Sequence, residues 1–260
     1  MDPLIQSLLT AGIINPQTAE ILNRQIATEV ARQWAEDSLF AATQATLSAR
    51  QEQFLALLLE SDFRPSGEQL NQFWASPNTV FGGQWLDTVR TIAGERATIA
   101  ALRAGQAATF DLVNRSVIDW ANRYYNSTDP NAFGSIPNLI ITERRQAYDA
   151  FLAWQQGALS GRADGLPQLR RALEPTFGPV RSNRIAVTET TRIFTRAVQE
   201  AERNNPFTVG FRWLTADPCE ICAPMHGQER SKNGGYASGL DIPAHVLCKC
   251  EEVPVTELTR

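Results

Sequence analysis

Residues 17–61 read QTAEILNRQIATEVARQWAEDSLFAATQATLSARQEQFLALLLES, and this stretch decides the fold of the first part of the chain. It contains neither glycine nor proline, the two residues that most often interrupt a helix. Asn15 before it is a suitable helix cap, and Pro16 fits the first helical turn. The stretch therefore predicts one very long helix, or two helices joined at a kink.

Apolar residues recur along this stretch at the spacing of one helix face. The predicted face consists of Leu22, Ile26, Val30 and Trp34, followed more weakly by Leu39, Leu47 and the apolar cluster at residues 54–59. We interpret the face as core packing. A helical arm that docks on a partner protein is the alternative.

The same periodicity predicts further helices along the chain. We expect them at residues 95–125, 139–156, 166–173 and 181–203, with a loop at 126–138 and a glycine-rich hinge at 157–165. Pro175 is expected to follow the end of the third helix. The predicted buried positions are Leu112, Val113, Val117, Ile118 and Trp120, and in the last helix Ile185, Thr188, Ile193, Ala197 and Ala201.

Two short strands are predicted near the carboxyl end. Val209, Phe211 and Trp213 alternate with polar or small residues, which is the period-two pattern of a strand. Residues 252–255 form the second candidate, and Pro254 favours an edge position for it. The sequence thus predicts an α+β protein, with a largely helical amino-terminal region at 1–160 and a smaller α+β carboxyl-terminal domain at 166–260.

Composition argues against several classes of protein. An apolar fraction of 43% is typical of a folded globular chain. The sequence has no apolar run long enough to span a membrane, and its first residues lack the features of a secretory signal. We therefore expect a soluble protein with no membrane partner. The net charge of −4 argues against a general nucleic-acid coat protein.

All four cysteines lie in two clusters between residues 219 and 250. The first is a Cys-x-x-Cys turn, which presents two sulfurs to one tetrahedral ion, and the second can complete the shell. Thiolate and imidazole groups suit Zn²⁺, so we predict a structural zinc site. The candidate ligands are Cys219, Cys222, His245, Cys248 and Cys250, with His226 as a sixth. The preferred set is Cys219, Cys222 and Cys250 with either His245 or Cys248.

Other interpretations of the cysteines stay open. They include two disulfides, a redox-active pair and inert buried thiols. The stretch from Pro218 to Cys222 also matches the second half of the zinc deaminase signature, but both histidines follow it, so the upstream His-x-Glu half is absent. Glu143 and Glu189 are isolated carboxylates in helices, which are more often solvated or ion-paired than catalytic. We expect no enzymatic activity.

The order of motifs over residues 166–255 is similar to that of the phage Mu F-like head morphogenesis family. The matching stretches are Arg184–Thr190, Phe211–Asp217, Cys219-x-x-Cys222 with Met225-His226-Gly227, Pro243-Ala244-His245 and Cys248-Lys249-Cys250. Two positions depart from the usual pattern of the family. Val187 and Lys249 each stand where the family has arginine.

This resemblance implies a minor capsid protein of a tailed bacteriophage, located in the virion and in the host cytoplasm during assembly. The implied partners are the portal protein and the major capsid protein, with packaged DNA as a further contact. The implied role is head assembly, DNA packaging or ejection, with the helical region docking on portal or capsid.

Two alternatives remain. The first is a zinc-dependent hydrolase or nuclease with His226 beside the metal. The second is a DNA-binding zinc module, which the ten basic and ten acidic residues of 176–260 do not favour.

Overall fold

A computed structural model describes residues 3–75, 81, 83–104, 110–159, 165–215 and 219–257, without the side chains of residues 20–26, 110, 158 and 159. The chain is α+β, with helices followed by a small sheet, as the sequence predicts. The helices are α1 Pro3–Thr10, α2 Pro16–Glu60, α3 Gly67–Ala75, α4 Gln84–Arg103, α5 Phe110–Tyr125, α6 Ile136–Leu159, α7 Gly165–Phe177 and α8 Pro179–Glu202. The strands are β1 Thr208–Leu214, β2 Glu229–Ser231 and β3 Glu251–Thr256, with a 3₁₀ turn, η3, at Ala223–Met225. A helix long and apolar enough to cross a bilayer is not found in the described part of the chain.

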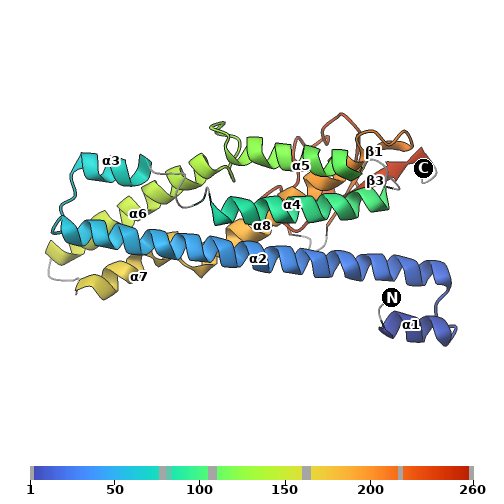
Figure 1. The fold of residues 1–260 in the computed structure, drawn as a ribbon, viewed down its shortest axis with the longest axis horizontal. Helices are drawn as coiled ribbons and strands as arrows, with labels where there is room; N and C mark the ends of the chain where they lie inside the picture. Colours follow the sequence, from blue (N-terminus) through green and yellow to red (C-terminus); the bar gives the residue numbers. More distant parts are fainter. Residues whose placement is uncertain are drawn as a thin grey trace.

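Helix α2 is one continuous helix of 45 residues, the first of the two predicted alternatives. At its start the Asn15 side chain accepts a hydrogen bond from the Thr18 backbone N–H at 2.8 Å, which confirms the predicted cap. At 1.5 Å per residue the helix is about 68 Å long. Figure 1 shows α3, α6 and α7 beside the end of α2, and the sheet near its beginning.

The buried face of α2 is only partly the predicted one. Leu39, Leu47 and Phe54 are fully buried, as expected, but Val30 and Trp34 are 63% and 41% exposed. On this part of the helix the buried face carries charged side chains instead. The prediction failed because α8 and β3 supply polar partners there, which an apolar pattern does not show. The side chains of Leu22 and Ile26 lie outside the described residues.

Helices α4 and α5 lie side by side, and the predicted single helix at 95–125 is wrong. Helix α4 begins at Gln84 and ends at Arg103, two residues before Gly105 in the sequence. The apolar pattern at residues 95–125 therefore belongs to two helices, the second half of α4 and the whole of α5. Within α5, Val113 and Val117 are buried as predicted. Leu112 is 58% exposed and was wrongly assigned to the core, because the register of the pattern was set from too long a helix.

Helix α8 lies at the centre and packs on α2, α4, α5, α7 and β3. It follows α7 after one residue, since α7 runs past Pro175 to Phe177 instead of ending near Leu173. A Cβ atom on Gly178 would stand 2.5 Å from the Glu174 carbonyl oxygen, so this tight junction needs glycine. Of the predicted inner face of α8, Ile185, Ile193, Ala197 and Ala201 are buried and Thr188 is half-buried.

Two apolar cores are present in the described residues. The larger runs from Ala35 in α2 to Ala201 in α8, so it extends across the expected boundary at residues 160–166. Phe54 is at one of its centres, with ring contacts to Phe73, Trp74, Phe151 and Phe177. The smaller core contains Trp213 and residues of the cysteine region. Helix α8 packs in the larger core, so the smaller carboxyl-terminal core consists of residues that follow α8.

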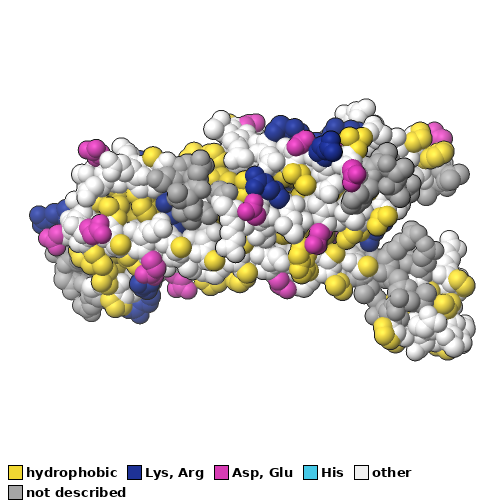
Figure 2. Space-filling view, viewed as in Figure 1, with side chains coloured by type: hydrophobic (Ala, Val, Ile, Leu, Met, Phe, Trp, Pro, Cys, Tyr) yellow, Lys and Arg dark blue, Asp and Glu magenta, His cyan; other side chains and the backbone are white. Residues whose placement is uncertain are grey.

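The sheet has strand order β2-β1-β3, with both pairs antiparallel. Strand β3 is at the edge, which confirms the position expected from Pro254. Gly210 in β1 lies so close to β2 that a Cβ atom would stand 2.2 Å from the Arg230 carbonyl oxygen. On the face shown in Figure 2, charged side chains of both signs are interspersed along the molecule.

Candidate metal centre

The first two cysteines are presented by a turn between β1 and β2. The Cys222 and Ala223 backbone N–H groups both donate to the Cys219 carbonyl oxygen, at 3.1 and 2.8 Å. This turn leads into η3, where the Met225 N–H donates to the Cys222 carbonyl at 2.9 Å. These local bonds bring both sulfurs to the same side of the chain, as the Cys-x-x-Cys spacing predicts.

The second cluster forms a tight turn just before β3. The Cys248 N–H donates to the His245 carbonyl at 3.2 Å, and Leu247 has a left-handed φ of 65°. This conformation is unfavourable for a leucine. The Leu247 N–H donates to the Thr188 hydroxyl of α8 at 3.0 Å, which helps to hold the turn.

All five predicted ligands are brought together at one place. The His245 Nε2 atom lies 3.0 Å from the Cys219 sulfur and 3.1 Å from the Cys222 sulfur. Cys222 also belongs to a second group with Cys248 and Cys250, and within each group the donor atoms lie within 4.8 Å of one another. Cys222 is therefore the residue that links the two turns.

The imidazole of His245 is oriented as a ligand. Its Nδ1 atom lies 2.7 Å from the Val246 carbonyl oxygen. Since a carbonyl only accepts hydrogen bonds, Nδ1 carries the proton in this contact and leaves the Nε2 lone pair directed at the sulfurs. A metal-bound histidine usually has its other ring nitrogen held in this way.

The donor set fits a thiophilic divalent cation such as zinc. Two sulfurs at about 2.3 Å from one tetrahedral ion lie roughly 3.8 Å apart. The Cys222 and Cys248 sulfurs are 3.9 Å apart, which agrees with that spacing and is far longer than a disulfide bond. All four cysteines are free thiols in this structure. These five donors exceed the four positions of a tetrahedral ion.

The proton affinities of the sulfurs reflect their crowding. Burial raises the pKa of Cys222 to about 12, whereas a hydrogen bond from the Cys250 thiol lowers the pKa of Cys248 to about 5. The Cys222 backbone N–H lowers the pKa of Cys219. The cluster therefore offers thiolates beside thiols. A metal cation would displace the remaining protons from its sulfur ligands.

The centre is enclosed by the smaller core. Cys222, Cys248 and Cys250 are buried against Trp213 and Tyr236, whereas Cys219 and His245 are partly exposed. His226, the sixth candidate, is not brought into either donor group of the described residues. Its Nδ1 atom lies 2.8 Å from the Thr215 hydroxyl instead, on the exposed side of the turn. Asp217 of the family-like stretch and Pro218 of the deaminase-like stretch lie outside the described residues.

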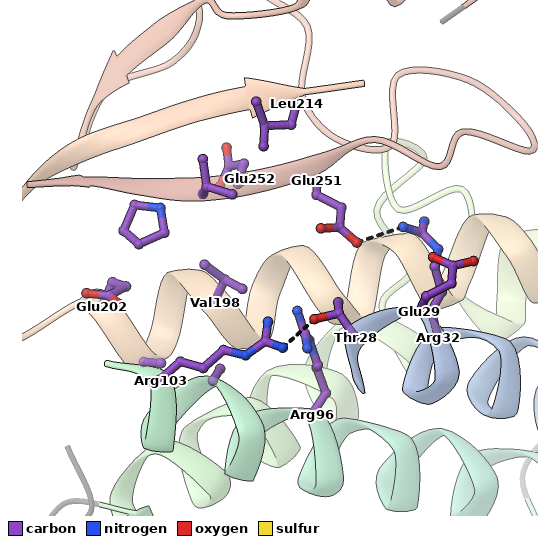
Figure 3. Close-up of a pocket in the computed structure, with 14 residues that line it drawn as sticks. Thr28, Glu29, Arg32, Arg96, Arg103, Val198, Glu202, Leu214, Glu251 and Glu252 are labelled. Carbon is purple, nitrogen blue, oxygen red and sulfur yellow. Dashed lines mark hydrogen bonds and ion pairs between the residues drawn. The ribbon is translucent and has the colours of Figure 1, made fainter. Parts of the chain in front are cut away.

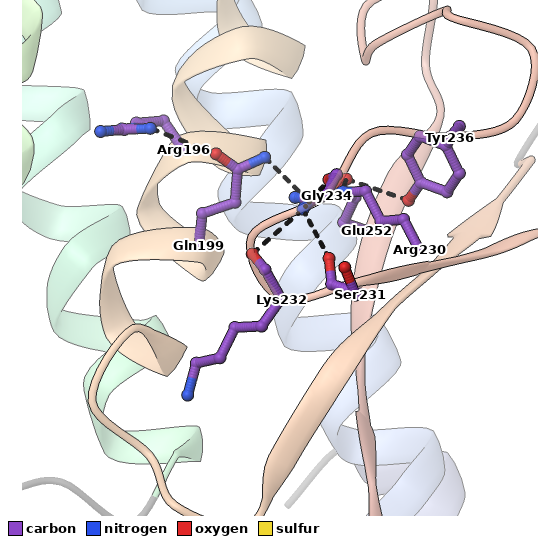
Figure 4. Close-up of polar contacts among 8 residues, drawn as sticks. All are labelled: Arg196, Gln199, Arg230, Ser231, Lys232, Gly234, Tyr236 and Glu252. Atoms are coloured by element: carbon purple, nitrogen blue, oxygen red, sulfur yellow. Dashed lines mark hydrogen bonds and ion pairs between the residues drawn. The ribbon is translucent and has the colours of Figure 1, made fainter.

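A buried polar network attaches the module to the helices (Figure 4). The Arg230 guanidinium donates two hydrogen bonds to the Glu252 carboxylate, at 2.8 and 2.9 Å, and others to carbonyls of its own loop. Tyr236 donates to the same carboxylate at 2.9 Å, and Gln199 of α8 does so at 2.9 Å. Glu252 thus joins β3, the β2 loop and α8.

Sequence reasoning missed the residues of the helical body that support the cysteine turn. The Thr191 hydroxyl of α8 donates to the Cys248 carbonyl at 2.6 Å and accepts from Arg32 of α2 at 2.6 Å. Arg32 also forms an ion pair with Glu251 of β3 at 3.0 Å. These partners are 159 and 219 residues away from Arg32, so no local pattern could indicate them.

Comparisons of the chain with family models, with curated proteins and with solved structures find no match.

Proposed function

We propose that the chain is a minor head protein of a tailed bacteriophage, acting in head assembly, whose carboxyl-terminal module is held together by a structural zinc ion. The order of its motifs supports the family. The convergence of Cys219, Cys222, His245 and the last two cysteines supports the zinc, and it is the single observation that carries the proposal. The small core that surrounds them gains its folding free energy from the ion, on the order of 10 kcal/mol.

A structural role fits this donor set better than a catalytic one. Catalytic zinc keeps one coordination position for water, with three protein ligands. Here five protein donors are available for four positions. His226, which would be the general acid or base in a zinc hydrolase, is bonded to Thr215 on the exposed side of the turn.

The proposed zinc is tested by metal analysis of the reduced, purified chain and of three variants. We expect about one zinc per chain, and its loss in Cys222→Ser because Cys222 belongs to both donor groups. Cys248→Ser and Cys250→Ser identify the fourth ligand, since only the true ligand is essential for tight binding. Met225→Leu, which alters the same small core without removing a donor, is the control and should keep its metal. Metal-free wild-type protein that melts as a stable fold would contradict the proposal.

The proposed assembly role needs a separate experiment. The chain is co-expressed with the portal and major capsid proteins of the same genome, and purified heads are examined for its presence. The exposed apolar residues Val30 and Trp34 on α2 support docking through the helical body. Replacing both with glutamate should reduce incorporation into heads without unfolding the chain. Heads that assemble and package normally without the chain, and never contain it, would refute this role.

A further inference from the structure

A second site, independent of the cysteines, lies between α2, α4, α8 and β3. The structure has a cavity of about 510 Å³ there (Figure 3), which is the size of a pocket for a small organic molecule. Three arginines line it, Arg32 from α2 and Arg96 and Arg103 from α4. Its apolar wall includes Val198 and Leu214.

Arg96 is the unusual member of this group. Its side chain is buried, with 4% of the residue exposed, yet its Nε and Nη1 atoms have no hydrogen-bond partner among the described residues. One face of the guanidinium lies over the Phe194 ring, 4.5 Å from its centroid. In Figure 3 the side chain points from α4 toward the cavity, beside the contact between Arg103 and Thr28. A buried cation in such a place is costly unless an anion compensates it.

The other buried arginines of the described residues differ from Arg96 in this respect. Arg32 bonds to two carboxylates, Arg50 to Glu143, and Arg181 to a side-chain amide and a carbonyl oxygen. Each of these three buried guanidinium groups therefore has acceptors within the chain. At Arg96, the part of the chain that the structure describes supplies no acceptor for Nε and Nη1.

Three of the four acidic residues that line the cavity are already engaged, and the fourth, Glu29, is exposed. Glu251 pairs with Arg32, and Glu252 pairs with Arg230. Glu202 accepts hydrogen bonds from Thr208 at 2.6 Å and from Asn205 at 2.7 Å. Burial, and next the positive charge of Arg103, lower the pKa of Arg96 to about 10, so the group stays cationic at neutral pH. Arg96 is therefore a cation whose unpaired N–H groups are available to an anion from outside the chain.

We propose that this cavity binds a phosphate group, which the guanidinium of Arg96 holds together with the neighbouring Arg103. Arginine forks match the oxygen atoms of phosphate and form two parallel hydrogen bonds with it. The space beside Val198 and Leu214 accommodates an organic part of the ligand. Such a ligand would join α4 to α8 and to the edge strand β3.

The test compares thermal unfolding of the full chain in inorganic phosphate and in chloride at equal pH and ionic strength. At 100 times its Kd, phosphate should raise the melting temperature of the wild type by roughly 5–10 °C. Arg96→Met should abolish the difference between the two buffers, and in chloride it should melt at or above the wild-type temperature because an unpaired buried charge is removed. Arg171→Met, a change at an exposed arginine, should keep the phosphate effect.

Calorimetric titration distinguishes a site from a general salt effect. Phosphate should bind the wild type at one site per chain, and Arg96→Lys should weaken the affinity at least tenfold because lysine lacks the bidentate fork. Adenosine monophosphate is the second probe. Binding at least tenfold tighter than inorganic phosphate assigns the site to an organic phosphate, and equal or weaker binding assigns it to free phosphate. If neither probe binds the wild type, or if Arg96→Met keeps the full phosphate effect, the proposal is wrong.

Discussion

Buried polar side chains in the helical body have partners that are distant in the sequence. Glu143 of α6 forms an ion pair with Arg50 of α2 at 3.2 Å. Glu189 of α8 accepts hydrogen bonds from Tyr125 at 3.0 Å and from Arg192 at 3.1 Å. The sequence allowed these two glutamates to be solvated or ion-paired, and both are ion-paired. Each carboxylate takes part in one ion pair, while the buried Glu143 Oε2 atom has no hydrogen-bond partner among the described residues.

We predict a pH-dependent cost for Tyr125→Phe. Burial, and next the charge of Glu189, raise the pKa of Tyr125 well above its usual value near 10. The hydrogen bond to a carboxylate should contribute about 1.5–3 kcal/mol to the free energy of unfolding at pH 8. Since the folded-state pKa is raised, this contribution is complete below pH 10 and is lost as the pH rises toward the folded-state value. The gap between variant and wild type should therefore shrink above pH 10, by up to about 1.4 kcal/mol per pH unit.

Urea unfolding at pH 8 and at pH 10.5 measures this gap. Tyr148→Phe is the control, because Tyr148 is 42% exposed and its replacement should change the free energy of unfolding by less than about 0.5 kcal/mol at pH 8. A gap for Tyr125→Phe that is the same at both pH values would mean that the phenol is not buried against Glu189.

At the scale of elements, the junction between α7 and α8 gives a sharp test of backbone packing. A Cβ atom on Gly178 would stand 2.5 Å from the Glu174 carbonyl oxygen, an atom that cannot move without shifting α7. We expect Gly178→Ala to destabilise the chain by about 1–3 kcal/mol. Gly67→Ala at the start of α3 is the matched control, since nothing lies within 4 Å of its added methyl group. Equal free energies of unfolding for the two variants would show that α7 and α8 are not held this closely.

The sequence predicts best the helices and strands whose ends are determined by neighbouring residues. The Asn15 cap and the absence of helix breakers define α2, and the alternation at Val209, Phe211 and Trp213 defines β1. The errors arise where distant contacts decide. Val30 and Trp34 continue the apolar pattern, but both side chains are exposed. The opposite face of α2 is buried instead, because Arg32 on that face bonds to Thr191 and Glu251.

The candidate metal centre likewise has features that neighbouring residues predict and features that depend on distant contacts. Spacing alone brings Cys219 toward Cys222, and it identifies all five donors that the structure gathers. It does not decide between Cys248 and Cys250, because that depends on how the second turn rests on α8. The cavity at Arg96 had no sequence signal, since its walls come from five elements. In a helical sequence pattern, an arginine that will be buried cannot be told from one that will be exposed.

At the scale of the whole molecule, the two cores predict two stages of unfolding when metal is removed. The larger core contains residues of the helices from α2 to α8 and no cysteine, whereas the smaller one includes or contacts all four cysteines. With zinc bound as proposed, a chelator removes most of the folding free energy of the small core but none of the packing around Phe54. The module should therefore unfold first, and the helical body should persist.

Circular dichroism and thiol titration together measure this separation. After chelation, all four cysteines should react rapidly with a thiol reagent and the near-ultraviolet signal of Trp213 should fall, while the far-ultraviolet helix signal changes little because the module has no α-helix in its described residues. The contacts of Arg32 and Gln199 to β3 oppose the separation, since they join the module to α2 and α8. Arg32→Met removes the first of these contacts, so thiol exposure after chelation should be faster in this variant than in the wild type. Loss of the helix signal in step with thiol exposure would instead make the two cores a single cooperative unit, with the metal site stabilising the entire length of α2 through Thr191.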